Sequence, residues 1–369
     1  MKNILLISNK VMHYRVSVYN YMNLRFKVYG FEFKVLTNEL QIENQNPINF
    51  ECITAPFRFI NYRKAIQDIN PEAVIIFLYM KDVIIWPLVH WLKYKRIPFA
   101  FWTKGGNWDA PDSTVRYYIF NYIHNLCDGL ILYSQKGFDW VKPQNHYKAF
   151  VASNTINFED FPEISESREQ IKKELGISFR KVVLFVGRMN VDSGRKKVDH
   201  LIEIFKHLQR DDVGLVIVGS GLSEMLKAQM NKVNTLYLGE VYDPQNLQIS
   251  RIFKMADVCA IPGHVGLSLN QAFFWGLPVV TEQGLQPPEI EYLKDGRNGF
   301  IVPENDLHAL KERILYLVDN DKERAIFSRN AQEDILREAS IEGMFSGFRD
   351  CVEFMINNKN LVRQHKTYW

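Results

Sequence analysis

The chain has 369 residues, which exceeds what one hydrophobic core usually supports and predicts two domains of roughly 150 to 200 residues each. Hydrophobic residues make up 47% of the chain and charged residues 24%, which excludes extensive disorder. The 45 basic residues nearly balance the 42 acidic ones, and a net charge of +3 excludes a generally basic nucleic-acid-binding protein.

The first ten residues, MKNILLISNK, contain an apolar run that is too short for a signal-peptide core and predicts a first β-strand. The most apolar later stretch, 73–91, contains Lys81, Asp82 and Pro87, which favours a buried strand and helix over a membrane span. The four cysteines form no CxxC pair, so neither zinc nor a disulfide framework is expected. We therefore expect a cytoplasmic protein.

Short β-branched runs alternate with longer amphipathic stretches along the chain. In the first half, the predicted strands are 3–7, 31–36, 73–78, 99–102 and 129–133. After a charged, helix-like stretch at 165–175, the second series is 181–186, 214–218, 235–238, 258–261 and 278–281. This alternation predicts βαβ units, and therefore an α/β chain with two Rossmann-like domains, each built on a parallel sheet.

The acidic, proline-containing segment NFEDFPEI near 157–163 separates the two series. We expect a first domain at 1–160, a second at 161–344, and a C-terminal helix at 345–369 that packs back on the first. Ligands of open α/β sheets bind beyond the carboxyl ends of the strands. Two such domains facing each other predict a site in the cleft between them.

The most informative segment reads ADVCAIPGHVGLSLNQA, followed by GLPVV, and predicts strand, glycine-rich turn, helix and strand. A helix that begins near Gly266 to Ser268 directs its free backbone amides and positive dipole end at the turn, which suits an anion. The alternative is structural: Gly266 only makes a tight turn and Ser268 caps the helix.

A second anion-binding signal follows the predicted strand KVVLFV. Arg188, next to Gly187, offers a bidentate fork for phosphate, and Lys196 supplies a flexible positive charge, so the pair predicts a diphosphate clamp. A solvated basic turn is the alternative. Gly239 and Val241, in LGEVYD, offer backbone groups to a base edge, whereas VGSG at 218–221 lacks the third glycine of a dinucleotide fingerprint and predicts a structural turn.

Together these residues resemble the retaining GT-B glycosyltransferases of family 4, the glycosyl transferases group 1, over essentially the whole chain. The motifs FVGR, KxVDxLIxxF, VGSG, LGxVYD, ADVxxxPGxVGLSxxxA, GxPVV and EIEYLKDGxNGFxV occur in the family's order. The VGLS variant resembles a subgroup assigned to cell-surface polysaccharide synthesis. The resemblance implies a GT-B fold, with acceptor binding in the first domain and nucleotide-sugar binding in the second.

The resemblance also assigns residues to roles. It implies catalytic roles, through stabilisation of the leaving diphosphate or contact with the sugar, for Arg188, Lys196 and Lys104. It implies donor binding by Gly187, Gly239, Val241, Gly263, His264, Val265, Gly266, Leu267, Ser268 and Gln271. On the acceptor side, with a plain loop as the alternative, it points to the HYR segment and the SNT turn, that is to His13, Tyr14, Arg15 and Asn154. No Asp-x-Asp motif is present where a metal is expected, so no metal and no cofactor are predicted.

Three departures from the family pattern bear on activity. The usual Glu-x7-Glu pair falls on Gly263 and Gln271, and Gln271 offers ribose hydroxyls only an uncharged contact. In FWTKGGN, Lys104 stands where the VGLS subgroup has the His of WGHG. The segment between Arg188 and Lys196 is longer than usual, which leaves open whether Lys196 or Lys197 binds the phosphate.

The implied function is transfer of a sugar from a UDP-sugar, or secondly a GDP-sugar, to a saccharide or polyprenyl-linked acceptor with retention of configuration. The rivals are a non-catalytic sugar-nucleotide-binding protein and a GT-B epimerase, which would need acid and base carboxylates that the sequence does not reveal. The first domain's basic and aromatic residues favour either an ordinary solvated face or peripheral contact with anionic lipid at the inner membrane surface. They are Tyr14, Arg15, Arg58, Tyr62, Arg63, Lys64, Lys93, Lys95 and Arg96.

Overall fold

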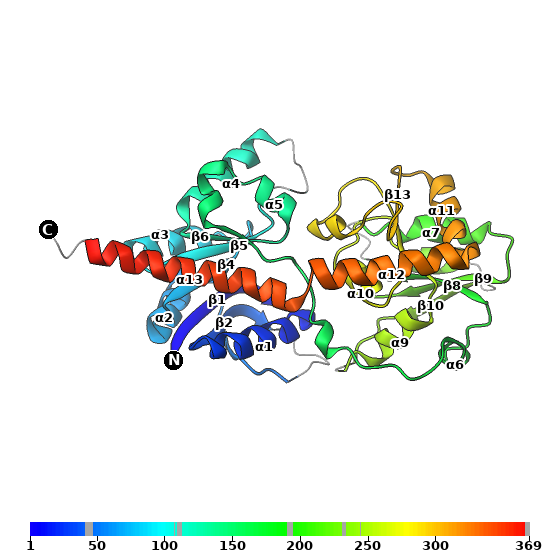
Figure 1. Ribbon diagram of the computed structural model, residues 1–369, viewed down its shortest axis with the longest axis horizontal. Coiled ribbons are helices and arrows are strands. Elements are labelled where there is room, and N and C mark those ends of the chain that lie inside the picture. The colour runs from blue at the N-terminus through cyan, green and yellow to red at the C-terminus, as the bar shows by residue number, and fades with distance from the viewer. Residues whose placement is uncertain are drawn as a thin grey trace. The chain divides into compact units, whose positions relative to one another are not determined.

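A computed structural model describes residues 1–40, 47–106, 108, 113–189, 195–230, 234–243 and 245–365, with side chains placed as far as residue 358. The chain divides into two compact units (Figure 1). Unit 1 comprises Met1–Asn157 together with Ser340–Trp369, and unit 2 comprises Phe158–Ala339. These boundaries differ by a few residues from the sequence-based ones at 160 and 344.

Unit 1 is built on a parallel sheet that has seven strands in the described ranges, in the order β3-β2-β1-β4-β5-β6-β7. The strands are β1 (Lys2–Val11), β2 (Phe31–Leu40), β3 (Glu51–Thr54), β4 (Ala73–Phe77), β5 (Phe99–Thr103), β6 (Gly129–Leu132) and β7 (Ala149–Val151). All five strands predicted for this half are present. The two edge strands β3 and β7 were not predicted, and both are short and partly exposed.

Alternate residues of β1 divide the core of unit 1 between the two faces of its sheet. Ile4 and Leu6 pack in a cluster with α1 (His13–Val28) and the start of α13 (Ile341–His365). Leu5 and Ile7 pack in a second cluster with α2 (Phe59–Ile69), α3 (Ile85–Lys95) and α4 (Thr114–Leu126). The short helix α5 (Gln135–Asp139) follows β6, and no helix in the described ranges is long and apolar enough to cross a membrane.

Unit 2 is built on a second parallel sheet, with six strands among its described residues in the order β10-β9-β8-β11-β12-β13. The strands are β8 (Lys181–Val186), β9 (Val213–Val218), β10 (Thr235–Gly239), β11 (Val258–Ala260), β12 (Val279–Glu282) and β13 (Gly299–Val302). The helices are α6 (Arg168–Glu174), α7 (Val198–Lys206), α8 (Glu224–Gln229), α9 (Leu247–Met255), α10 (Leu267–Phe274), α11 (Leu307–Asp319) and α12 (Asp321–Glu338). Two parallel sheets with covering helices confirm the predicted α/β class.

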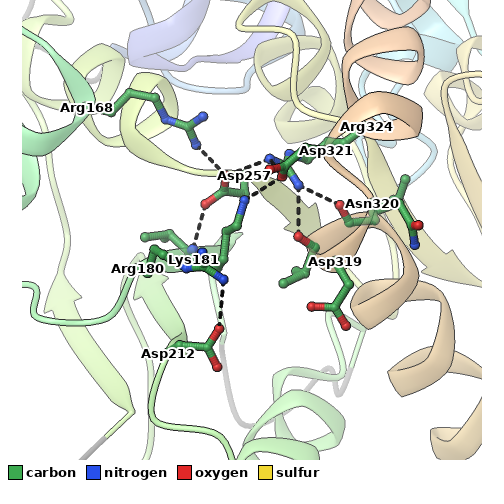
Figure 2. A network of polar contacts seen from close by, with 12 residues as sticks. Arg168, Arg180, Lys181, Asp212, Asp257, Asp319, Asn320, Asp321 and Arg324 are labelled. Atoms are coloured by element: carbon green, nitrogen blue, oxygen red, sulfur yellow. Dashed lines mark hydrogen bonds and ion pairs between the residues drawn. The ribbon is translucent and has the colours of Figure 1, made fainter.

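A buried carboxylate organises the amino-terminal edge of the unit 2 sheet. Figure 2 shows Asp257, directly before β11, at the centre of a polar network. It accepts the backbone N–H of Val182 at 2.8 Å and pairs with Arg168 at 3.0 Å and Arg324 at 3.4 Å. Asp257 is 5% exposed, so its buried charge is compensated by these partners together. The aspartate of the ADV motif therefore has a structural role. It lies at the amino-terminal ends of the strands, whereas the candidate site lies at their carboxyl ends.

Candidate functional site

The carboxyl edge of the unit 2 sheet contains a topological switch point. The chain builds β8, β9 and β10 outward in one direction and then returns to place β11 on the other side of β8. Connections after β8 and β11 therefore leave the sheet in opposite directions, the arrangement at which open parallel sheets form a ligand-binding crevice. Gly187 and Arg188 follow β8, and the turn from Pro262 to Ser268 follows β11. The two predicted anion-binding segments are thus neighbours in the fold.

The turn after β11 leads directly into helix α10. Gly266 is the N-cap residue, and its φ of 58° with ψ of −158° is a backbone conformation that side chains rarely adopt. A Cβ at Gly266 would meet only the His264 Nδ1, at 3.9 Å, so the space beside the backbone is open. The first amides of a helix have no acceptor inside the helix and favour an anion. Ser268 lies at the second helical position, so it is not the N-cap that the structural alternative required.

Lys196 extends across the crevice between β8 and β11. Its Nζ donates to the carbonyl of Val265 at 2.8 Å. A Cβ at Gly187 would come within 2.9 Å of the Lys196 Cε, so the glycine makes room for the lysine side chain. Burial lowers the pKa of Lys196 to about 8, while Cys259 and Glu289 act in the opposite direction. Because this pKa of about 8 is still above neutral pH, Lys196 is cationic at pH 7 and places a positive charge beside the turn that precedes α10.

The neighbouring Lys197 is directed to a different cluster. Its Nζ contacts the Glu282 carboxylate at 2.9 Å and Glu304 at 3.0 Å. Glu282 is fully buried and also contacts the Nδ1 of His200 at 2.6 Å. Lys197 thus neutralises a buried carboxylate at the end of β12. Of the two lysines that the sequence left open, Lys196 is the one at the glycine-rich turn.

Arg188 follows β8, is exposed, and lies next to Tyr242. Burial raises the pKa of Tyr242, with Glu240 acting the same way and Arg188 opposing it. The turns after β8, β9 and β10 pack closely here, because a Cβ at Gly219 would lie 2.0 Å from the carbonyl oxygen of Gly187. This close packing agrees with VGSG as a structural turn. Gly239 accepts the N–H of Gly219 at 2.7 Å.

Gly263 has no room for a side chain. An added Cβ would lie 1.9 Å from the carbonyl oxygen of Arg195, and the adjoining backbone is tied in place. The N–H of Gly263 donates to Lys196 O at 3.2 Å, and that of His264 donates to Arg195 O at 2.6 Å. The position where the family pattern has its first glutamate is therefore occupied by backbone. Gln271, at the second glutamate position, is half-buried on α10, one turn beyond Ser268.

Sequence reasoning missed the residues that support the turn from the segment after β12. Gln286 contacts both Gly263 and Val265, and the Thr281 hydroxyl lies 3.3 Å from the Gly263 carbonyl. Glu289 is 5% exposed and acts electrostatically on Lys196. The motif EIEYLKDG contains Glu289, but its spacing alone did not indicate contact with a lysine more than ninety residues earlier in the chain.

In unit 1, two of the predicted acceptor-side residues contact each other. Arg15, in the first turn of α1, donates to the Asn154 Oδ1 at 2.7 Å, and its guanidinium lies 4.9 Å from the centre of the Trp102 ring. Arg15 is 7% and Asn154 is 3% exposed. His13 and Tyr14 form an edge-to-face ring pair at 5.4 Å beside them. Arg15 therefore ties the start of α1 to the segment after β7.

Lys104 lies in unit 1, directly after β5, with a half-buried side chain. Its carbonyl accepts the indole N–H of Trp108 at 2.9 Å, and Gly105 and Gly106 pack against Gly137 and the Trp140 ring. The loop is thus closely packed around the lysine backbone. Asn107, which ends the predicted motif, and the segment 190–194 of the insertion before Lys196 lie outside the described residues.

Ligating side chains are dispersed in the part of the chain that the structure describes. No group of three or more His, Cys, Asp or Glu there could hold a metal ion. The four cysteines are free thiols, and burial raises the pKa of Cys127 to about 11 and of Cys259 to about 12. Among the described residues, Glu289 acts electrostatically on Lys196, and Arg188 and Glu240 act on Tyr242.

The match to a known protein family lies within unit 2. A family model described as Glycosyl transferases group 1 matches residues 167–334. The chain is 25% identical over 202 residues to a poly(ribitol-phosphate) alpha-N-acetylglucosaminyltransferase of Staphylococcus aureus, covering 53% of this chain and 38% of the relative. It is 32% identical over 165 residues to a phosphatidyl-myo-inositol mannosyltransferase of Mycobacterium leprae, covering 42% of each. The chain thus spans less than half the length of these two relatives.

Solved structures extend the likeness to both units. The Anabaena protein HepE, crystallised with UDP, matches with a TM-score of 0.75 over 96% of this chain and all of its own, at 14% identity. At that identity the likeness concerns the fold alone. Residues 167–334 are therefore similar to the glycosyl transferases group 1 family, in a chain with the GT-B fold.

Proposed function

We propose that this chain is a retaining glycosyltransferase that binds the diphosphate of a nucleotide sugar at the carboxyl edge of the unit 2 sheet. The observation that carries the proposal is the meeting of Lys196, the Gly266 turn and the start of α10 at the switch point between β8 and β11. An ammonium group and the free amides of a helix start are complementary to a diphosphate. Arg188, on the exposed side, adds a second cation.

Such a site stabilises charge that develops as the glycosidic bond to the diphosphate breaks. The acceptor oxygen forms a bond to the anomeric carbon on the face from which the nucleoside diphosphate departs. The acceptor proton passes to the departing diphosphate, so positioning and anion stabilisation are the protein's main contributions. Lys196, Arg188 and the amides of Gly266 to Ser268 supply that stabilisation, and Lys104 contacts the donor sugar or the acceptor.

UDP-sugars are the proposed donors, with GDP-sugars second. HepE, whose fold matches, has been crystallised with UDP and with UDP-glucose. The proposed partners of the base are backbone groups of Gly239 and Val241, at and just after the end of β10, and the proposed partner of the ribose is Gln271. We propose that metal is not required, since the cationic side chains and helix amides already oppose the diphosphate charge.

The proposed acceptor is a saccharide or a polyprenyl-linked saccharide of cell-surface polysaccharide synthesis. Two relatives bear the names of a poly(ribitol-phosphate) and a phosphatidyl-inositol glycosyltransferase, and a third that of a capsular polysaccharide biosynthesis glycosyltransferase of Staphylococcus aureus. In unit 1, exposed side chains support peripheral contact with the inner membrane surface. They are Tyr94, which adjoins the basic Lys93, Lys95 and Arg96 in the sequence, and Val115, Tyr117, Tyr118 and Tyr122 of α4. The Tyr122 hydroxyl lies 3.4 Å from the Nε2 of His90 on α3.

Two members of the sequence-based surface set do not belong to it. Arg15 is held by Asn154, and Tyr62 is fully buried on α2, so neither contributes to a membrane-facing surface. Exposed Tyr94 of α3 and the exposed residues of α4 are added to the candidates that remain. Arg58, Arg63 and Lys64 lie at or on α2 instead.

One observation favours the non-catalytic alternative, a sugar-nucleotide-binding protein. Backbone fills the position of the first family glutamate at Gly263, so no carboxylate can be placed there without displacing residues 195–196. Both functions require nucleotide binding at the same turn, and they differ in whether sugar is transferred.

Thermal unfolding with a panel of UDP, GDP, ADP and their sugars tests the proposal, because a ligand that binds the folded state raises the melting temperature. We expect a rise of several degrees for one nucleotide in the wild type and a much smaller rise in Arg188→Ala. No shift for any nucleotide at millimolar concentration would contradict the proposed site. Release of nucleotide from the preferred sugar donor, with and without an acceptor extract, then separates transferase from binding protein.

The lowered pKa of Lys196 predicts that nucleotide affinity depends on pH. Below about 8 the side chain is cationic in the free protein and attracts the diphosphate; above that pH, binding must take up a proton. Between pH 8 and 9 we therefore expect the dissociation constant of the preferred nucleotide to rise, by up to about tenfold. Calorimetric titrations at pH 7, 8 and 9 would show this, and the same slope in Lys196→Met would refute the assignment.

A further inference from the structure

Gln286 lies after β12 and reaches back to the glycine-rich turn with both ends of its side-chain amide. Its Oε1 accepts the N–H of Val265 at 3.1 Å, and its Nε2 lies 3.0 Å from the carbonyl of Gly263. The same Nε2 lies 3.0 Å from Thr281 Oγ1 and 3.0 Å from the Glu282 carbonyl. The amide orientation follows from these partners, since a backbone N–H requires the oxygen and the carbonyls require the nitrogen.

These contacts complete the anchoring of three successive amides. The N–H groups of Gly263 and His264 donate to the carbonyls of Lys196 and Arg195. The third amide, the N–H of Val265, donates to the side chain of Gln286. The backbone N–H groups of residues 263–265 are thereby all bonded, and the next residue, Gly266, is the N-cap of α10. The diphosphate-facing amides of the proposed site follow directly after the anchored ones.

Val265 is the link between this anchor and the proposed phosphate site. Its N–H is held by Gln286, its carbonyl accepts Lys196 Nζ at 2.8 Å, and the residue is fully buried. The peptide groups on both sides of Val265 therefore have fixed orientations. Rotation of either one would turn the Gly266 backbone and move the amides of Leu267 and Ser268 relative to Lys196.

We propose that Gln286 is a positioning residue for donor binding: it holds the Gly263–Ser268 turn in the shape that presents its amides to the diphosphate. The inference rests on the proposed function, because it assumes that the diphosphate binds at this turn. The turn carries no side chain at Gly263, and its side-chain support comes from Gln286 together with Thr281. Such support matters because small displacements of binding groups are costly in binding and in rate.

The test compares Gln286→Met, which keeps the length of the side chain and loses its hydrogen bonds, with Gln283→Met as a matched control. Gln283 is exposed in the same segment and contacts the fold through its backbone N–H to Val302. Calorimetry with the preferred nucleoside diphosphate and with its nucleoside separates the phosphate contribution from that of the base. We expect Gln286→Met to weaken diphosphate binding roughly tenfold to a hundredfold, to leave nucleoside binding nearly unchanged, and Gln283→Met to behave as the wild type.

Three results would count against these ideas in different ways. A wild-type protein that binds no nucleotide would overturn the proposed function. Wild-type diphosphate affinity in a folded Gln286→Met would overturn the positioning role and leave the proposed function intact. Equal loss of nucleoside and diphosphate binding would also overturn it, since that indicates general damage to the unit. If Gln286→Met does not fold, Gln286→Asn, which keeps an amide but is one methylene too short, is measured in its place with the same expectations.

Discussion

Replacement of Lys196 by alanine is expected to lower kcat/KM for sugar transfer by roughly a hundredfold to a thousandfold, which is typical of removing one group that stabilises transition-state charge. The reason is positional: Lys196 Nζ lies at the carbonyl of Val265, directly before the helix start that faces the proposed diphosphate. Initial rates with the donor found in the nucleotide panel would measure the effect. Nucleotide affinity should fall as well.

Lys197→Ala provides a matched control one residue away. Lys197 contacts Glu282 and Glu304, so its loss removes a partner from a buried carboxylate and should lower the melting temperature. Nucleotide affinity should stay within about twofold of the wild type, because no phosphate contact is lost. The reverse pattern, with transfer lost in Lys197→Ala and kept in Lys196→Ala, would show that the two lysines exchange roles when substrate binds.

Restoring the family carboxylate by Gly263→Glu is expected to damage the protein and not to activate it. Even the Cβ would lie 1.9 Å from Arg195 O, in backbone that two hydrogen bonds hold in place. Overpacking of this kind should lower the melting temperature by about 6 °C or more. Gly263→Ala isolates the steric part, and it should show most of the loss in a thermal unfolding measurement.

Gln271→Glu restores the second carboxylate without this obstacle. The residue is half-buried on α10, where glutamate is at least as good a helix former as glutamine, so normal folding is expected.

One outcome would contradict the prediction for Gly263→Glu. If that variant folded as stably as the wild type and transferred sugar faster, the backbone at 195–196 would have to move to make room for the new side chain. The finding that Gly263 has no room for a side chain would then not hold for the active protein.

Sequence periodicity predicted the parts of the fold that bury continuous apolar runs. The central strands β1, β4, β5, β8 and β9 are such runs, and each was recognised. The edge strands β3 and β7 and the terminal strand β13 were missed. They have three or four residues each, and β3 and β7 bury no residue fully, so neither length nor periodicity distinguishes them from loops.

The parts of the candidate site whose residues are close together in the sequence could be predicted. Gly266 and Ser268 lie together in a strand-turn-helix pattern, and the positive φ of Gly266 explains the glycine. Contacts between distant segments were not predictable in this way. The closure of Gly263 by Arg195, and its bond to Gln286, depend on how three loops meet at one sheet edge.

The path of the chain through the two units has a practical consequence for dissection. Unit 2 is a continuous insertion, Phe158–Ala339, within a unit 1 whose last helix arrives only after it. Phe345, Phe348 and Val352 of that helix complete the core against Trp102 and Ile131. A fragment that ends at Asn157 would expose this apolar face to water, whereas unit 2 is one continuous segment that we expect to fold when expressed alone. Unit 1 can be isolated only by joining residue 157 to residue 340 or by supplying the final helix as a separate peptide.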